Sequence, residues 1–75
     1  MIIVGIPPCK ACKVLAEQYP AVEYVELPLV AGKGNPRALE VKKAIRKLNI
    51  TGFPVVINNE MTEVLTYSAL EFADV

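Results

Sequence analysis

The chain has 75 residues, of which 53% are hydrophobic, and its eight basic and eight acidic side chains leave no formal net charge. This length predicts a single domain over residues 1–75, with enough apolar residues for a core that needs no metal or disulfide cross-links. The zero net charge argues against nucleic acid or an anionic membrane surface as a partner. No run approaches the ~20 apolar residues of a membrane span, and the N-terminus lacks the basic segment of a signal peptide, so we expect a cytoplasmic protein.

The first third of the sequence predicts a strand, a helix and a second strand. Met1–Ile6 is a continuous apolar run that stops at two prolines, which favours a strand buried on both faces. In Cys9–Tyr19 the apolar side chains recur at spacings of three and four, as on one side of a helix, and Pro20 ends the pattern. Val22–Leu27 contains strand-forming residues and two glutamates, which favours an edge strand.

The rest of the chain predicts a helix, a hairpin and a final helix. The helix begins at Pro36 after the potential N-cap Asn35, runs to about Leu48, and has an apolar side and a mostly basic side. The later elements are strands Pro54–Ile57 and Met61–Thr66, joined by a two-residue turn at Asn58-Asn59, and a helix over Tyr67–Asp74. This order predicts an α/β domain with a four-stranded mixed sheet, strand order 2-1-3-4, and three helices on its two faces.

The two cysteines, Cys9 and Cys12, lie three positions apart where the first strand gives way to the first helix. Thiols at this spacing can close a small disulfide ring, and the unpaired N–H groups of a helix N-terminus stabilise a thiolate. Lys10 and Lys13 add positive charge near Cys9, whereas Cys12 faces the apolar side of the helix. The pattern predicts that Cys9 attacks a substrate disulfide and that Cys12 resolves the mixed disulfide. The alternative is a pair of cysteines that only pack as small apolar side chains.

Cys9-Lys10-Ala11-Cys12 at this junction, together with Thr51-Gly52-Phe53-Pro54-Val55-Val56 before the hairpin, resembles the glutaredoxins and related small redoxins. The resemblance covers essentially the whole chain and implies a minimal thioredoxin fold. It implies a cis Phe53–Pro54 bond against the cysteine pair, with Phe53 and Pro54 beside the bound substrate. Lys10-Ala11 departs from the Pro-Tyr that the family usually has between the cysteines, and Lys10 is a further candidate substrate contact. The resemblance also implies a monomeric thiol-disulfide oxidoreductase without a tightly bound cofactor, acting on protein or glutathione-mixed disulfides, with ribonucleotide reductase as a candidate partner.

The resemblance leaves open whether glutathione or thioredoxin reductase supplies the electrons. Glutathione-dependent members commonly have a basic residue where Ile6 stands, and a Gly-Gly pair where this chain has Leu65-Thr66-Tyr67-Ser68. Thr66, Tyr67 and Ser68 remain candidate substrate contacts, because a helix start can bind a carboxylate. Lys33 and Arg37 stand where the family often holds the glycine carboxylate of glutathione; the alternative for both is a solvated basic helix face.

Metal binding is a second functional hypothesis. Some family members with this cysteine motif bridge an iron–sulfur cluster between two copies, and a dimer of this chain could likewise supply four cysteines to a cluster or to zinc. A single copy cannot fill a tetrahedral site, because it has no histidine and no second cysteine pair. Residues 33–47 carry six basic residues against one acid, and residues 51–75 carry four acids and no base. We expect this polarity to steer a protein partner.

Overall fold

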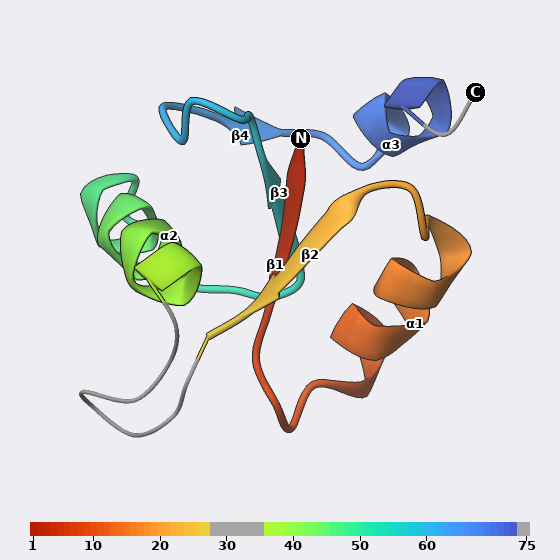
Figure 1. Cartoon of the computed structure of the whole chain (residues 1–75), viewed down its shortest axis with the longest axis horizontal. Helices are drawn as coiled ribbons and strands as arrows, with labels where there is room; N and C mark the ends of the chain where they lie inside the picture. The colour runs from red at the N-terminus through yellow and green to blue at the C-terminus, as the bar shows by residue number, and fades with distance from the viewer. Residues whose placement is uncertain (28–35, 74–75) are drawn as a thin grey trace.

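The computed structural model describes residues 1–27 and 36–73 of the chain. Over these residues the elements follow in the order β1 (Ile2–Gly5), α1 (Lys10–Gln18), β2 (Glu23–Glu26), α2 (Pro36–Lys47), β3 (Val55–Ile57), β4 (Val64–Leu65) and α3 (Ser68–Ala73) (Figure 1). The described strands form one four-stranded mixed sheet in the order β2-β1-β3-β4. The predicted α/β class and strand order are therefore confirmed.

β1 lies in the middle of the sheet, and all four of its residues are buried. It runs parallel to β2, with Ile3 opposite Tyr24 and Gly5 opposite Glu26. Its pairing with β3 is antiparallel. Because neighbouring residues of a strand point to opposite faces, Ile3 and Gly5 share one face of the sheet with Tyr24.

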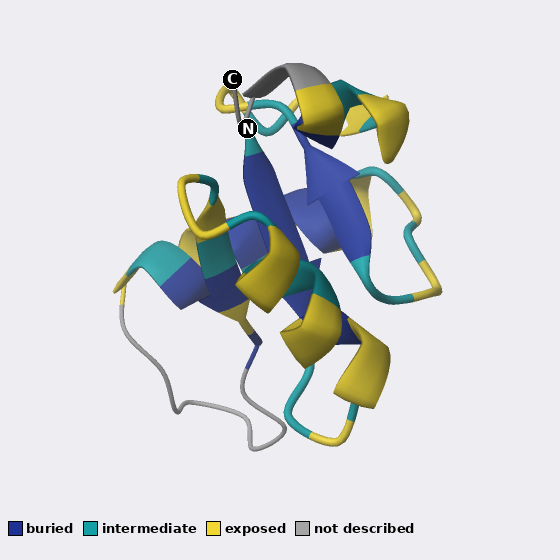
Figure 2. Cartoon of the chain, turned by 90° about the vertical axis from the view of Figure 1, so that its right-hand side faces the viewer, coloured by how far each residue is buried: buried dark blue, intermediate teal, exposed yellow. Residues whose placement is uncertain are grey.

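The two faces of the sheet carry separate apolar clusters. On one face α2 covers the larger cluster, which contains Ile2, Val4, Val25, Leu27, Ala38, Val41, Ile45, Val55 and Ile57. On the other face Ile3, Val56 and Leu70 pack with side chains of α1 and β2. Figure 2 shows the buried strands in dark blue between helices whose outer sides are exposed. The prediction of helices on both faces is confirmed, and none of the described helices is long and apolar enough to cross a membrane.

The hairpin connection differs from the prediction. Instead of a two-residue turn, residues 58–63 connect β3 to a β4 of only two residues. Asn58 organises this longer loop, because its Oδ1 accepts hydrogen bonds from the backbone N–H groups of Thr62 at 2.8 Å and Glu63 at 3.0 Å. Within this loop the left-handed backbone conformation falls on Met61, with φ of 60°, and not on Asn58 or Asn59. Residues 61–63, which the sequence pattern assigned to the last strand, belong to this loop.

Candidate active site

Cys9 and Cys12 form a disulfide at the start of α1, with their Cα atoms 5.4 Å apart. The chain turns sharply after β1, and the backbone N–H of Cys9 donates to the carbonyl of Ile6 at 3.1 Å. Cys9 is the N-cap of α1 in an extended backbone conformation, and its Sγ accepts a hydrogen bond from the Cys12 N–H at 3.2 Å. The sulfur thus takes the position that an oxygen usually occupies at a helix N-cap.

The two sulfurs lie in different surroundings. Cys9 is partly exposed, whereas Cys12 is completely buried. Cys12 lies directly over Gly5, so closely that a Cβ added to Gly5 would lie 2.6 Å from the Cβ of Cys12 and 2.9 Å from its Sγ. Gly5 was not among the predicted site residues. A glycine within an otherwise Ile- and Val-rich strand is the signal that could have identified it, because such a glycine often marks a close approach.

The same point above Gly5 is 2.6 Å from the hydroxyl oxygen of Tyr24. This oxygen is inaccessible to solvent, and no described group meets it with full hydrogen-bond geometry. Burial first, and then the negative charge of the Glu26 carboxylate and its approach to the hydroxyl as an acceptor, raise the pKa of Tyr24. The sequence pattern did not predict this residue, because its place beside Cys12 depends on the register of β2 against β1.

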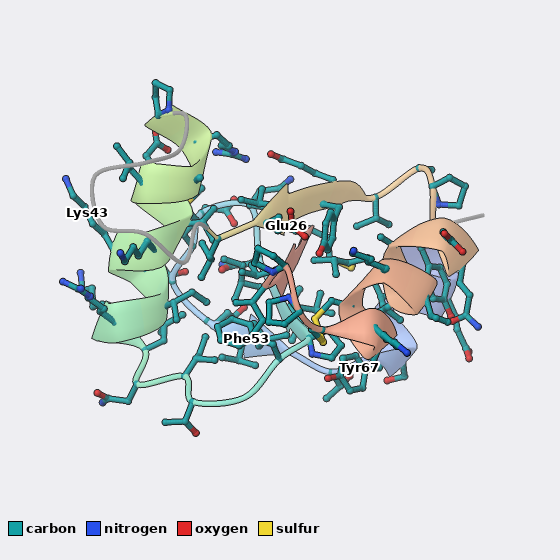
Figure 3. All side chains as sticks on the ribbon, turned by 90° about the horizontal axis from the view of Figure 1, so that it is seen from below. Glu26, Lys43, Phe53 and Tyr67 are labelled. Atoms are coloured by element: carbon teal, nitrogen blue, oxygen red, sulfur yellow. A yellow bond between two sulfur atoms is a disulfide. The ribbon has the colours of Figure 1, made fainter. Side chains whose placement is uncertain are left out.

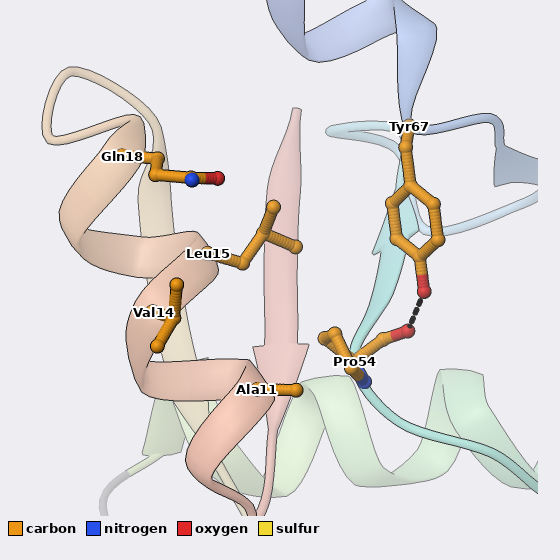
Figure 4. A pocket seen from close by; sticks show the side chains of 6 residues that line it. All are labelled: Ala11, Val14, Leu15, Gln18, Pro54 and Tyr67. Carbon is orange, nitrogen blue, oxygen red and sulfur yellow. Dashed lines mark hydrogen bonds between the residues drawn. The ribbon is translucent and has the colours of Figure 1, made fainter.

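The Phe53–Pro54 peptide bond is cis, as the resemblance implies. Pro54 lies at the base of an apolar groove of about 520 Å³ that opens between α1 and the residue before α3 (Figure 4). The groove is lined by Ala11, Val14, Leu15, Gln18, Pro54 and Tyr67. Since Ala11 stands between the two cysteines in sequence, one end of the groove adjoins the disulfide.

Tyr67 stands across this groove from the side chains of α1 (Figure 4). The Tyr67 hydroxyl donates a hydrogen bond to the carbonyl of Pro54. About half of the Tyr67 side chain, and a similar share of Val14 across the groove, remain exposed to solvent. Phe53 does not line the groove: its ring packs on the α2 side of the sheet, so only its backbone could meet a substrate there. Figure 3 looks onto this end of the molecule, with Phe53 and Tyr67 near the disulfide in the view.

The structure places only some of the other predicted contact residues near the cysteines. Lys10, the first residue of α1, is exposed. Thr66 and Ser68 are exposed on either side of Tyr67, and their hydroxyls are 2.8 Å apart in a hydrogen bond. Lys33 lies outside the described residues.

Arg37 is not brought to the cysteines. Its Nε and Nη2 donate to the two carboxylate oxygens of Glu23, both at 2.8 Å, and this hydrogen bonding lowers the pKa of Glu23. Glu23 lies opposite Ile2, whereas the disulfide lies against Gly5. Three residues along a strand separate the two places, or about 10 Å. In the structure the guanidinium of Arg37 is paired with Glu23, and its role as an anchor for a glutathione carboxylate stays a prediction.

Comparisons with known proteins add no assignment, because no family model, curated protein or solved structure matches this chain. The described part of the chain also contains no cluster of three or more cysteine, aspartate or glutamate side chains that could hold a metal ion. The chemistry of the site must therefore be inferred from its own residues.

Proposed function

We propose that this chain is a glutaredoxin-like thiol-disulfide oxidoreductase with a minimal thioredoxin fold, which works in the cytoplasm as a monomer. The observation that carries the proposal is the disulfide at the N-terminus of α1, in which one sulfur is partly exposed and the other is completely buried. A structural cross-link needs no such asymmetry, whereas a two-thiol cycle needs one sulfur that a substrate can reach and one that it cannot.

The cycle starts with the reduced pair. The Cys9 thiolate attacks a substrate disulfide, and the substrate sulfur that leaves carries away the electron pair of the broken bond. The N–H of Cys12 already points at Cys9 Sγ, and a thiolate is a better acceptor for this hydrogen bond than a disulfide sulfur. Cys12 then attacks Cys9 Sγ, so that the second substrate thiol is released and the Cys9–Cys12 disulfide forms.

The groove provides the binding surface for the substrate. Its walls are mostly apolar, and they include Ala11, which stands between the two cysteines in sequence, as well as Pro54 and Tyr67. An extended segment next to the substrate cysteine can lie there, with its backbone along Phe53 and Pro54. The substrate class is a protein with an exposed disulfide, ribonucleotide reductase being one candidate.

Either glutathione or a thioredoxin reductase would restore the dithiol. With Arg37 paired to Glu23, the described residues that could instead meet a glutathione carboxylate are Lys10, Thr66 and Ser68. A reductase would instead dock on the rim of the groove. The two electron donors can be distinguished by assay. A protein that takes electrons from glutathione turns over with glutathione and glutathione reductase, whereas one that depends on a thioredoxin reductase does not.

The test is a disulfide-reduction assay run with each of the two electron sources in turn. Wild-type protein is expected to turn over with one of them, Cys9→Ser to be inactive in both, and Cys12→Ser to accumulate as a mixed disulfide through Cys9. Val64→Ser, an exposed position on β4, is the control that should keep full activity. Activity that survives Cys9→Ser would refute the proposal. Visible absorbance in fresh protein that is lost in Cys9→Ser would support the metal-binding dimer instead.

A further inference from the structure

The buried hydroxyl of Tyr24 makes no hydrogen bond of full geometry that would stabilise the described fold. It is sealed from solvent, and the carboxylate of the exposed Glu26, which approaches it, does not meet it with full hydrogen-bond geometry. An unsatisfied buried polar group is rare in native proteins and disfavours the state that contains it. Phenylalanine could fill the same apolar position between β2 and α1 without this penalty. We therefore expect the hydroxyl to find a hydrogen-bond acceptor in another state of the protein.

A candidate partner in another state of the protein is the sulfur of Cys12. The position of a Cβ on Gly5 is 2.6 Å from the Tyr24 hydroxyl oxygen and 2.9 Å from Cys12 Sγ, so both atoms border the point that a side chain on residue 5 would occupy. Because residue 5 is glycine, no side chain of its own stands between them. In the disulfide, Cys12 Sγ is bonded to Cys9 and is only a weak acceptor. Reduction frees it to turn about the Cα–Cβ bond.

We propose that Tyr24 is the hydrogen-bond donor to the resolving cysteine: once the disulfide is reduced, its hydroxyl donates to Cys12 Sγ and stabilises the Cys12 thiolate. The proposal rests on the redox cycle described above and adds to it a residue outside the cysteine motif. Two conditions favour donation over proton abstraction. The raised pKa of Tyr24 keeps its proton in place at neutral pH, and a phenol that keeps its proton can only donate to a thiolate.

This hydrogen bond acts in the resolving step, in which Cys12 displaces the substrate sulfur from Cys9. Cys12 loses its proton, its sulfur attacks Cys9 Sγ, and the bond from Cys9 to the substrate sulfur breaks as the Cys9–Cys12 bond forms. The substrate sulfur leaves with the electron pair and takes up one proton, so the proton lost by Cys12 is balanced. Tyr24 keeps its own proton throughout. Its hydrogen bond offsets the burial of Cys12, which otherwise disfavours the thiolate.

The test measures the acidity of Cys12 in Cys9→Ser protein, which removes the coupling between the two thiols. The ¹³Cβ chemical shift of Cys12 is followed against pH with and without Tyr24→Phe. A hydrogen bond to a charged acceptor predicts that Tyr24→Phe lowers the acid dissociation constant of Cys12 about tenfold. The other ionisable groups described around this site are Lys10 and Lys13 of α1, Tyr19 just after α1, and Glu26 on the same strand as Tyr24, and none of them is altered by the substitution.

Tyr19→Phe is the matched control, because Tyr19 packs on the same apolar cluster and its substitution also removes one phenol hydroxyl. We expect it to change the Cys12 constant less than about twofold, well short of the tenfold effect at Tyr24. A Tyr24→Phe constant equal to that of the control would overturn the inference. So would a drop in the melting temperature of the oxidised protein with no change in Cys12 acidity, which would assign Tyr24 a purely structural role.

Failure of the proposed function is recognised separately. Cys12 titrates in this experiment whether or not the pair exchanges with a substrate. If wild-type protein reaches no reversible equilibrium with dithiothreitol, the oxidoreductase proposal fails, and the Cys12 titration still decides the hydrogen bond from Tyr24.

Discussion

Gly5→Ala tests the close packing beneath the disulfide. The new Cβ would lie 2.6 Å from the Cβ of Cys12, 2.6 Å from the Tyr24 hydroxyl oxygen and 2.9 Å from Cys12 Sγ. Non-bonded carbon atoms rest about 3.5–4.0 Å apart, so something must move by about 1 Å. The movement cannot be confined to a flexible side-chain end, because the Cβ of Cys12 is fixed to the backbone of α1 and the residue is completely buried.

The expected loss of stability follows from two opposing effects. Overpacking a filled core costs about 1–3 kcal/mol. Replacing glycine by alanine restores about 0.4–1 kcal/mol by restricting the unfolded chain. The two ranges leave a free energy of unfolding lower by up to about 2.6 kcal/mol, centred on about 1.3 kcal/mol. For a domain of this size, the central value corresponds to a melting temperature lower by about 5–10 °C.

The measurement is urea and thermal unfolding of the oxidised protein, followed by circular dichroism. Gly52→Ala is the matched control, because a Cβ at Gly52 would meet no atom within 4 Å, and its stability should equal or slightly exceed that of wild type. In a Tyr24→Phe background the cost of Gly5→Ala should fall by about 0.5 kcal/mol or more, since one of the two shortest contacts is gone. If Gly5→Ala is as stable as Gly52→Ala, the packing described above is wrong.

Three further predictions concern other parts of the fold. Asn58→Ala should lower the free energy of unfolding by about 1–2 kcal/mol in urea, because two backbone N–H groups lose their acceptor, whereas Asn58→Asp keeps the acceptor and should lose less. Tyr67→Phe, which removes the bond to the Pro54 carbonyl, should cost at most about 1 kcal/mol in urea and leave the apolar groove in place; a cost above that of Asn58→Ala would contradict the exposed position of Tyr67. Because Arg37 lowers the pKa of Glu23, the pair stabilises the fold at neutral pH, and this contribution disappears as the pH falls through the folded-state value below 4.5. The difference in urea stability between wild type and Glu23→Gln should therefore shrink on acidification, and a difference that grows would refute the ion pair.

The architecture was predictable because each of its elements leaves a local mark on the sequence. Apolar runs, spacings of three and four, and prolines at the boundaries locate the strands and helices, and α1 begins and ends within one residue of its predicted limits. The order of elements then restricts the sheet to few topologies. The cysteine motif was predictable for the same reason, since Cys9 and Cys12 are neighbours within one helical turn.

The rest of the site depends on contacts between distant segments. Tyr24 meets Cys12 only because β2 pairs with β1 in one particular register, and a one-residue slip would turn its ring to the α2 face. Arg37 was assigned to the site by its place in the chain, but α2 begins beside β2, where Glu23 offers two oxygens to its guanidinium. In the hairpin, strand propensity predicted a longer β4, but the side chain of Asn58 satisfies backbone donors that a strand pairing would have used.

The proposed cycle requires Cys12 to be shielded from solvent and also to form a thiolate, and the packing around Cys12 is compatible with both requirements. The resolving sulfur must stay away from solvent and competing disulfides, so it is buried over Gly5. Burial, however, disfavours the thiolate that the resolving attack requires. A donor beside the sulfur removes this conflict, provided that it holds its own proton at neutral pH and that no side chain on residue 5 blocks it. The Tyr24 hydroxyl meets both requirements, and the proposed hydrogen bond would account for a buried hydroxyl without full hydrogen-bond geometry beside the oxidised pair.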